Sequence, residues 1–545
     1  MARVDRFRSL DAGLAWDAVV IGAGLGGLTT AAIMSAKGKK VLVLDQHYVA
    51  GGNATMFKRP GYIFDVGVHY IGDCTPQGQI PRVLREAGVE LNFLPMDPDG
   101  FDTLCFADGT RFSYPKGVDA FEARLLEMFP AERKGVKKWT SFLRQVWRLM
   151  CAENEPLKLL RALPFSLLAV RHLESTLEQV LDSCTKDARL RAVLIGPHMD
   201  HAVAPSRVSA LLHAGLVMHY LVDGAFYPEG GGQAMSDALV EAIENGGGRV
   251  LLLSKAERIV VEDGRAAGVV FTNKHLGRVT VRAPIVVSNA DLKATYQRLL
   301  PEHAVPGAVR AKVESYEMAP GIAILYLGVK QEALGKEGTL NTNYWVFPSL
   351  DMEQDYAALK ANEFVAAPSV YVTLSSNKDP GQKVSPDGVM NLQVMALAPS
   401  DPKVWGLAGD EAYRKSPEYK EKKQQLRDRL LAQVRSVFPD LEGGIVYEEM
   451  ATPLTHARYT LSTGGTPYGI AATTAQFDRK RPGAQTHLPG LLLAGASTRN
   501  AHGVLGACLS GREAARTALK QLARLPQPRP QLAPAQPVPA TVGQT

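Results

Sequence analysis

A glycine-rich turn between two buried strands near the N-terminus limits the fold of this chain more than any other sequence feature. Residues 18–21 are a short apolar run, Gly22-Ala23-Gly24-Leu25-Gly26-Gly27 follows, and residues 28–37 have the composition of a helix. Residues 40–44 (KVLVL) are then predicted to form a buried parallel strand that ends before Asp45. Strand, turn, helix and strand together predict a βαβ unit of Rossmann type.

The glycines and the acid of this unit are candidate ligands of a dinucleotide. Gly22 permits the tight turn after the strand, Gly24 lets the backbone approach a pyrophosphate, and Gly27 lets the helix pack on the sheet. Asp45 is positioned to accept the ribose hydroxyls of the adenosine, and an acid at this position disfavours a 2′-phosphate. The pattern therefore predicts FAD or NAD as the ligand.

Two later segments favour FAD. Gly51-Gly52-Asn53 comes where many FAD enzymes place glycines against the flavin's phosphates and ribityl chain, whereas NAD enzymes need no glycine pair there. Leu491–Leu493 predicts a last strand, which leads through Gly495 into a loop of small residues. A helix that opens at residue 503 would direct its N-terminus at the flavin and stabilise the anionic reduced ring.

Residues 64–70 (FDVGVHY) predict a further strand with a glycine at its centre. Regular alternation would put Gly67 and His69 on one face and Tyr70 on the other. A glycine within a strand marks close approach by something flat or by other backbone, and an isoalloxazine ring fits that description. The strand is therefore expected to present either His69 or Tyr70 to the reacting face, but not both.

Composition is that of an ordinary globular protein. Of 545 residues, 46% are hydrophobic and 21% are charged, which excludes wholesale disorder. A net charge of +6 without a clustered patch argues against nucleic acid as a partner. The five cysteines lie far apart without a CxxC motif, which favours free thiols and a cytoplasmic location. The histidines between residues 198 and 219 follow no zinc spacing, so no metal site is expected.

The simplest organisation is one nucleotide-binding domain in three segments, interrupted by a second domain in two pieces. The three segments are 1–105, 226–300 and 441–524, and the second carries a hairpin turned by Asp263-Gly264. The two inserts are 106–225, which has a helical pattern, and 301–440, which mixes strands at 322–329, 370–374 and 390–396 with a helix at 418–437. Residues 525–545 are rich in Pro, Ala and Gln and predict a disordered tail.

The chain resembles the family of FAD-dependent phytoene desaturases, carotenoid isomerases and retinol saturases. The resemblance rests on GAGLGG…VLVLD…GGN, FDVGVHYIG, YPEGGGQAMSDAL, VVSNAD and LAGAS…GVLGACLSGREAA, which occur in family order across about residues 16–522. FDVGVHYIG and residues 205–231 are most similar to the retinol saturase branch. The implied fold is α/β, with a Rossmann-like FAD-binding domain in three segments and an inserted α+β substrate domain, as in amine oxidases.

The resemblance also implies a set of cofactor-binding residues: Gly22, Gly24, Gly27 and Asp45 at the ADP half, Gly52 and Asn53 at the diphosphate, Ala256 at the adenine through its backbone, and Gly67, Gly495, Val504 and Leu505 against the ring system. Two positions depart from the family pattern. Ala496 stands where the family commonly has an acid that binds the ribityl chain, and Ala501-His502-Gly503-Val504 alters the family's GxGV turn.

The activity implied by the resemblance is FAD-dependent oxidoreduction at C=C or C–C bonds of a long apolar polyene, a retinoid or a carotenoid. Saturation is the expected direction, and desaturation or isomerisation is the alternative. A flavin amine oxidase ranks third, because that family sets an aromatic residue beside the flavin where this chain has Val504-Leu505. A non-enzymatic isoprenoid-lipid carrier, like the Rab GDP-dissociation inhibitors, is disfavoured by the intact glycine loop. The electron partner is a nicotinamide such as NAD(P)H, a quinone or oxygen.

Three residues are candidate proton carriers. His69 has the side chain best suited to move a proton near neutral pH. The resemblance instead implies that Tyr70 lines the substrate cavity while His69 touches the flavin edge. His502, in the C-terminal loop, is the next candidate.

Residues 157–173 (LKLLRALPFSLLAVRHL) mix apolar bulk with basic side chains. They are predicted to form either an in-plane membrane helix or a core helix with a solvated basic face. An in-plane helix would suit a protein that takes its substrate from a bilayer, with a peripheral position at the inner face of the membrane.

Overall fold

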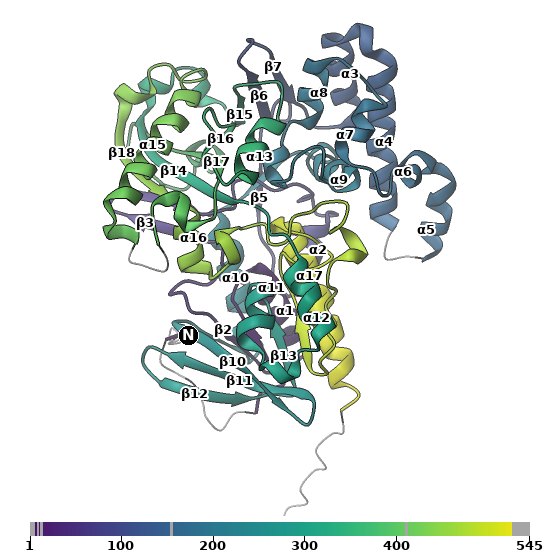
Figure 1. Cartoon of the computed structure of the whole chain (residues 1–545), viewed down its shortest axis with the longest axis vertical. Helices are drawn as coiled ribbons and strands as arrows, with labels where there is room; N and C mark the ends of the chain where they lie inside the picture. Colours follow the sequence, from purple (N-terminus) through teal and green to yellow (C-terminus); the bar gives the residue numbers. More distant parts are fainter. Residues whose placement is uncertain (1–5, 8–9, 11–14, 153–155, 409–412, 526–545) are drawn as a thin grey trace, which may run out of the picture.

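A computed structural model of the chain describes residues 6–7, 10, 15–152, 156–408 and 413–525. These residues form two halves, each built on one sheet (Figure 1). We call them the parallel-sheet half, which holds the five-stranded sheet, and the mixed-sheet half, which holds the seven-stranded sheet and the helices between residues 118 and 221. The predicted tail beyond residue 525 lies outside the described residues.

The parallel-sheet half begins with the predicted βαβ unit. Its sheet has the order β19-β13-β1-β2-β9, and every described pair in it is parallel. The strands are β19 (Leu491–Leu493), β13 (Ile285–Ser288), β1 (Ala18–Ile21), β2 (Val41–Leu44) and β9 (Arg249–Leu251). β1, β2 and β13 are buried throughout, as expected for parallel strands covered on both faces.

Helices cover this sheet, and α1 (Leu25–Ala36) is their centre. It packs against α17 (Gly503–Leu522) and α10 (Gly232–Asn245), so almost every residue of α1 is buried. This burial explains why its sequence is apolar or small on all sides. A three-stranded antiparallel sheet, β10 (Ser254–Glu262), β11 (Arg265–Asn273) and β12 (Gly277–Arg282), lies beside it and contains the predicted Asp263-Gly264 hairpin.

The mixed-sheet half has the strand order β18-β14-β17-β16-β15-β6-β7. The strands are β18 (Ile445–Ala451), β14 (Gly321–Lys330), β17 (Val389–Ala398), β16 (Val370–Leu374), β15 (Asn343–Phe347), β6 (Asp102–Phe106) and β7 (Arg111–Tyr114). They pair antiparallel except for β15 and β6, which are parallel. α15 (Pro417–Val434) contacts β15, β16 and β17 and supplies Leu426, Leu430 and Leu431 to a shared core.

A helical layer completes the mixed-sheet half. It comprises α3 (Val118–Met128), α4 (Arg133–Ala152), α5 (Pro156–Ala162), α6 (Leu167–Arg171), α7 (Leu177–Asp182), α8 (Ala188–Ile195) and α9 (Ala210–Leu221). α4 and α9 pack on each other, and Trp139 and Phe142 of α4 are fully buried in the core that they share with the sheet. Figure 1 shows α5 and α6 at the outer edge of this layer, on the side away from the sheet.

The strand pairing bears on the proposed domain division. β6 lies largely before residue 106 and β18 lies after residue 440, yet both pair within the seven-stranded sheet. The division into three cofactor-binding segments and two inserts stays a proposal, and the sheet would move its boundaries to before residue 102 and after residue 451.

One predicted strand is wrong. Residues 64–70 are not a regular strand, because β4 (Tyr62–Asp65), paired with β3 (Met56–Arg59), ends at Asp65. The buried Asp65 carboxylate accepts hydrogen bonds from the Tyr227 and Ser375 hydroxyls and from the Gly232 N–H, at 2.5 to 3.2 Å. These partners come from distant segments, so local alternation could not have predicted where the strand ends.

Candidate active site

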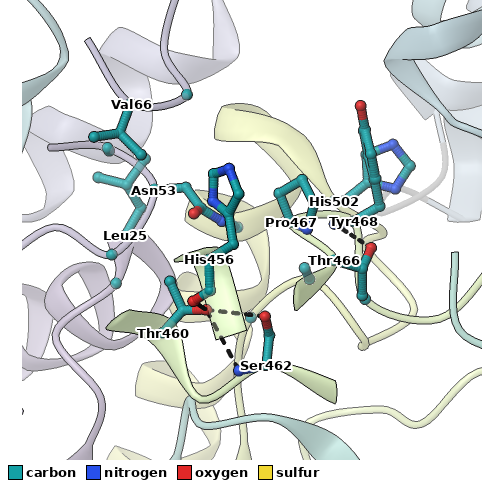
Figure 2. Close-up of a pocket in the computed structure, with 18 of the residues that line it drawn as sticks. Leu25, Asn53, Val66, His456, Thr460, Ser462, Thr466, Pro467, Tyr468 and His502 are labelled. Carbon is teal, nitrogen blue, oxygen red and sulfur yellow. Dashed lines mark hydrogen bonds between the residues drawn. The ribbon is translucent and has the colours of Figure 1, made fainter. Parts of the chain in front are cut away.

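One cavity of about 1220 Å³ runs between the two halves. Pockets for a single drug-sized ligand usually measure roughly 300 to 1,000 Å³. The cavity therefore has room for a dinucleotide and for part of a second ligand. Figure 2 shows how residues from opposite ends of the chain face each other across it, with Leu25 and Asn53 opposite His456, Pro467 and His502.

The glycine-rich turn forms one end of the cavity. Gly22 has a φ of +96°, which confirms the predicted tight turn at a position that favours glycine. A Cβ on Gly27 would lie 2.1 Å from the Gly22 carbonyl oxygen, so Gly27 permits helix and strand to pack and does not itself line the cavity. α1 starts after Gly24 without a side-chain cap, which leaves its first N–H groups for a ligand.

The second glycine segment lies directly against the first. The Gly51 N–H donates to the Ala23 carbonyl at 2.7 Å, and a Cβ on Gly52 would come within 3.2 Å of the Gly24 Cα. Gly24, Gly52 and Asn53 thus line the same stretch of cavity. Such close backbone approach is what a diphosphate between two loops requires.

Asn289 is a residue of this region that sequence reasoning did not single out. It follows β13 at the carboxyl edge of the parallel sheet, and its Nδ2 donates to the Gly22 carbonyl at 3.2 Å. A Cβ on Gly26 or Gly495 would meet the Asn289 Oδ1 at 2.6 or 2.7 Å. Asn289 therefore fills the space between the glycine-rich turn and the loop at Gly495. The signal that could have found it is the polar Asn-Ala-Asp run directly after a buried strand.

Asp45 lines the cavity at the end of β2. One carboxylate oxygen accepts from the Ala23 N–H and the other from the His47 N–H, both at 2.7 Å. Burial raises the pKa of this carboxyl, and the two backbone hydrogen bonds oppose the rise. Asp45 therefore also fixes the glycine turn, and Ala256 of β10 lines the same end of the cavity.

The C-terminal loop forms the middle of the cavity. Gly495, Ala496, His502, Val504 and Leu505 all line it, and α17 starts after His502 without a side-chain cap. The carbonyl of Ala496, where the family pattern has an acid, accepts a hydrogen bond from the buried Arg481 guanidinium at 2.6 Å. This contact fixes the loop without a carboxylate.

His69 and Tyr70 both line the cavity, and which of them faces the reacting side of the flavin stays a prediction. The chain bends at residues 66–67 instead of continuing as a pleated strand, which removes the alternation that separated them. Both His69 ring nitrogens are buried without a hydrogen-bond partner among the described residues. Burial lowers the pKa of His69 to about 3, and Lys378 adds to the effect, so the ring is neutral at pH 7.

Tyr70 joins a buried polar cluster that the sequence did not predict. Its hydroxyl donates to the Asp200 carboxylate at 2.9 Å, and its ring stacks on Tyr220 with 4.3 Å between centroids. Asp102 interacts with the same hydroxyl from β6, and its carboxylate accepts from the Asn343 amide at 2.9 Å. Asp200 and Tyr70 line the cavity, whereas Asp102 lies behind them.

Lys378 closes the cluster from α14 (Ser375–Lys378). Its buried ammonium donates to the His69 carbonyl, the Asn343 Oδ1 and the Thr373 hydroxyl, each at 2.6 Å. Burial lowers the pKa of Lys378 to about 7, and Asp102 and Asp65 oppose this effect. Lys378 therefore fixes the backbone at His69 without itself lining the cavity.

His201 and His213 are linked by hydrogen bonds. The His201 Nε2–H donates to His213 Nδ1 at 3.1 Å, and the His213 Nε2–H donates to the Leu194 carbonyl at 3.0 Å. Burial lowers the pKa of His213 to about 4, so these rings are neutral hydrogen-bonding groups.

Beyond Tyr70 the cavity continues as an apolar space between the mixed sheet and α9. Its lining side chains are mostly aliphatic or aromatic and come from both layers and from two neighbouring segments: Met199, Leu212, Leu216, Ile322, Ile324, Trp345, Tyr371, Met395, Leu397 and Tyr468. Tyr70, Tyr220 and Tyr371 add stacked aromatic rings with hydroxyl groups to this lining. Met150 at the end of α4 also lines the cavity and is 43% exposed.

A flavin dinucleotide suits this cavity on the observations above. Two uncapped helix N-termini open into it, the Gly24–Gly52 contact leaves a cradle that side chains would fill, and the His69 nitrogens lack partners. All the residues that the resemblance implied for the cofactor line the cavity except Gly27. Their individual roles stay predictions.

Comparison with known proteins agrees with this geometry. The profile of the family described as flavin containing amine oxidoreductase matches residues 25–519. All-trans-retinol 13,14-reductase of Rattus norvegicus is 30% identical over 507 residues, which cover 88% of this chain and 82% of that protein. The chloroplastic prolycopene isomerase of Daucus carota is 25% identical over 517 residues, which cover 91% of this chain and 78% of that protein.

Among solved structures, an oxidoreductase from Methanosarcina mazei has the same fold. It superposes with a TM-score of 0.62 at 18% identity, covering 92% of this chain and 99% of that one. The likeness confirms the predicted fold class, an α/β fold with a Rossmann-like domain and a second, inserted α+β domain.

Proposed function

The chain belongs to the family of flavin-containing amine oxidoreductases, and from that membership we propose that it reduces a carbon–carbon double bond of a long apolar polyene. Membership makes it a flavin-dependent oxidoreductase. The polyene is inferred from the names of its relatives, a retinol reductase and a prolycopene isomerase. This inference agrees with the resemblance to the retinol saturase branch.

The observation that carries the proposal is the continuity of one cavity from the glycine turn to the apolar space. Bound FAD would supply hydride transfer at its ring system. Gly24 and Gly52 would hold its diphosphate, and Asp45 its ribose hydroxyls. The apolar walls beyond Tyr70 would hold an elongated hydrocarbon and keep water from the reacting bond.

Reduction is the first choice of direction, because the retinol reductases are among the most similar relatives in sequence. Isomerisation is the second candidate, favoured by the prolycopene isomerases. Oxidation of an amine ranks lower, because Val504 and Leu505 line the cavity where an aromatic residue beside the flavin was expected for that activity.

The substrate would reach the cavity from a membrane surface. α5, α6 and the turn between them expose large apolar side chains that include Leu157 at 72% and Phe165 at 70% exposure. Residues 157–173 form α5, a 3-10 turn and α6 instead of one helix, and their large apolar side chains are mostly exposed, which favours a membrane surface over a core helix with a solvated basic face. Lys158, Arg161 and Arg171 are exposed in the same segment, so the surface combines apolar insertion with attraction to anionic headgroups.

Met150 supplies the connection between this surface and the cavity. Its side chain is 43% exposed, yet it lines the cavity and packs on Gly215 of α9. None of the described helices is long and apolar enough to cross a membrane. We therefore propose peripheral association, at the inner face of the membrane of the cell.

The proposal is tested with purified protein reconstituted with FAD. The flavin is reduced anaerobically with NADH, NADPH, a quinol or dithionite, and all-trans-retinol or prolycopene is then added in detergent micelles. A product heavier by two hydrogens supports reduction, and a product of unchanged mass with altered retention supports isomerisation. Unchanged polyenes together with peroxide release from an amine would contradict the proposal.

A further inference from the structure

We propose that Asp200, oriented by Tyr70, is the acid that protonates the substrate carbon next to the one that receives the hydride. The inference rests on the proposed function for its hydride and adds the proton source, which the cofactor alone does not define. Asp200 lies at the end of the short helix His198–Asp200 and lines the cavity together with Tyr70.

Two hydrogen bonds hold Asp200 in the cavity lining. The Tyr70 hydroxyl donates to Asp200 Oδ2 at 2.9 Å, and the Tyr70 ring is held between Tyr220 and Tyr371, at 4.3 and 6.1 Å between centroids. The His502 Nε2–H donates to the Asp200 carbonyl at 2.9 Å. That contact ties Asp200 to the loop before Val504 and Leu505, which is predicted to lie against the flavin ring.

The surroundings keep the carboxyl protonated. Burial and, to a smaller extent, the charge of Asp102 together raise the pKa of Asp200 to about 8, while the Tyr70 hydrogen bond opposes the rise. The other titratable groups that interact with Asp200 are Tyr220, Tyr371, Tyr468 and the neutral His502 ring.

The nearby cation does not neutralise Asp200. The Lys378 ammonium is held by the His69 carbonyl, Asn343 and Thr373, and it acts on Asp102 and Asp65. Asp200 is therefore a carboxylic acid near neutral pH, with a proton available to a ligand in the cavity.

The two histidines predicted as proton carriers are less suited to this step. Burial lowers the pKa of His69 to about 3 and that of His502 to about 4, so neither ring carries the extra proton at pH 7. His69 has unpartnered nitrogens and is suited to a hydrogen bond with the cofactor. His502 is held by the Asp200 carbonyl.

The step balances as a two-electron reduction. One alkene carbon would receive the hydride that bound, reduced FAD supplies, and its neighbour would receive the Asp200 proton. Two C–H bonds then form while the alkene π bond, the carboxyl O–H bond and the flavin N–H bond break. The substrate is reduced and the flavin is oxidised. The Asp200 carboxylate then keeps the Tyr70 hydrogen bond and regains a proton from solvent.

The first test compares Asp200→Asn and Tyr70→Phe with Asp355→Asn in the FAD-loaded protein. Asp355 is a matched control, because it is buried, burial raises its pKa, and it does not line the cavity. Asp200→Asn should keep its flavin and lower kcat about 100-fold or more, with little change in KM, because general acids contribute about 10²- to 10⁴-fold. Wild-type kcat in Asp200→Asn would overturn the inference.

The second test reads the proton directly, without turnover. In infrared spectra of the FAD-free protein, the C=O band of a protonated carboxylic acid should titrate near pH 8 in wild type and be missing in Asp200→Asn. Asp102→Asn removes the neighbouring charge and should lower the pH at which this band disappears, together with the alkaline limb of the rate profile. A band that is the same in wild type and Asp200→Asn would overturn the inference.

The two proposals fail in different ways. A wild-type protein that leaves every polyene unchanged contradicts the proposed function, and the catalytic role of Asp200 with it. A protein that reduces a polyene equally well with and without the Asp200 carboxyl contradicts this inference alone.

Discussion

The two walls of the cavity differ in whether backbone or side chains form their surface. The wall from the parallel-sheet half consists largely of backbone, with Gly24, Gly52 and Gly495 at its surface and helix N–H groups directed into the cavity. The wall from the mixed-sheet half consists of side chains, among which Tyr70 and Asp200 are held by partners from distant segments. The backbone wall binds its ligand in space that glycines leave empty, so a side chain added there should block ligand binding. The side-chain wall depends on buried hydrogen bonds, so loss of one partner should lower the free energy of unfolding or change the protonation of its neighbours.

The largest effect is expected from filling the backbone wall with Gly24→Val. A Cβ on Gly24 would approach only the Asn289 amide, at 3.0 Å, so the fold should survive while the branched side chain occupies the diphosphate space. The variant should purify without flavin absorbance and melt near wild type.

Gly443→Val is the matched control, because nothing lies within 4 Å of a Cβ at that exposed position. Full flavin content in Gly24→Val would show that the glycine turn does not bind the dinucleotide.

The next effect comes from breaking the side-chain wall with Lys378→Met. Loss of the ammonium leaves the His69 carbonyl without its donor and removes one donor from Asn343. We expect about 3 kcal/mol of lost unfolding free energy, since each unsatisfied buried group costs about 1–3 kcal/mol.

Chemical denaturation measures this loss. Lys383→Met, an exposed lysine paired with Asp387, is the control and should cost about 0.5 kcal/mol or less. Equal losses in both variants would mean that the cluster does not hold the mixed-sheet wall together.

A third prediction addresses the outer surface, where the mixed-sheet half exposes apolar side chains. The double variant Leu160→Asp with Phe165→Asp should weaken binding to anionic vesicles by about 2 kcal/mol, or roughly 30-fold, because two apolar side chains no longer insert. Wild-type binding should also weaken with salt, since each basic residue near the surface contributes about 1 kcal/mol.

Vesicle flotation measures this binding. Val446→Asp, at an exposed apolar position on β18, is the control for added negative charge away from this surface. Unchanged partitioning of the double variant would discard the membrane surface formed by α5 and α6.

The smallest effect is a pH dependence confined to the side-chain wall. The native state binds the Asp200 proton more tightly than the unfolded chain, because the pKa is raised to about 8 in the fold. The resulting stability is present below the unfolded pKa of about 4 and is lost as the pH rises through about 8.

Wild type should therefore lose unfolding free energy relative to Asp200→Asn as the pH rises from about 5 to about 9. Melting temperatures of both proteins across this range measure the difference. Parallel curves would contradict a protonated Asp200.

The backbone wall could be predicted because its signals are local. β1, the glycine turn, α1 and β2 lie within 30 residues of one another, and the steric need for Gly22 and Gly27 is visible in the sequence itself. The same holds for the Asp263-Gly264 hairpin and for β19 followed by α17. In each case the chemistry of a few adjacent residues determines the structure, whatever the rest of the chain does.

The side-chain wall was decided only by the tertiary structure. Asp102, Asp200 and Lys378 are far apart in the chain, and each alone looks like a surface charge in the sequence. The prediction of a strand at residues 64–70 was wrong because distant residues also decide where that strand ends. Tyr227, Gly232 and Ser375 donate hydrogen bonds to Asp65, the last residue of β4. A raised carboxyl pKa needs burial and a neighbouring charge, and both arise only when distant segments pack around one cavity.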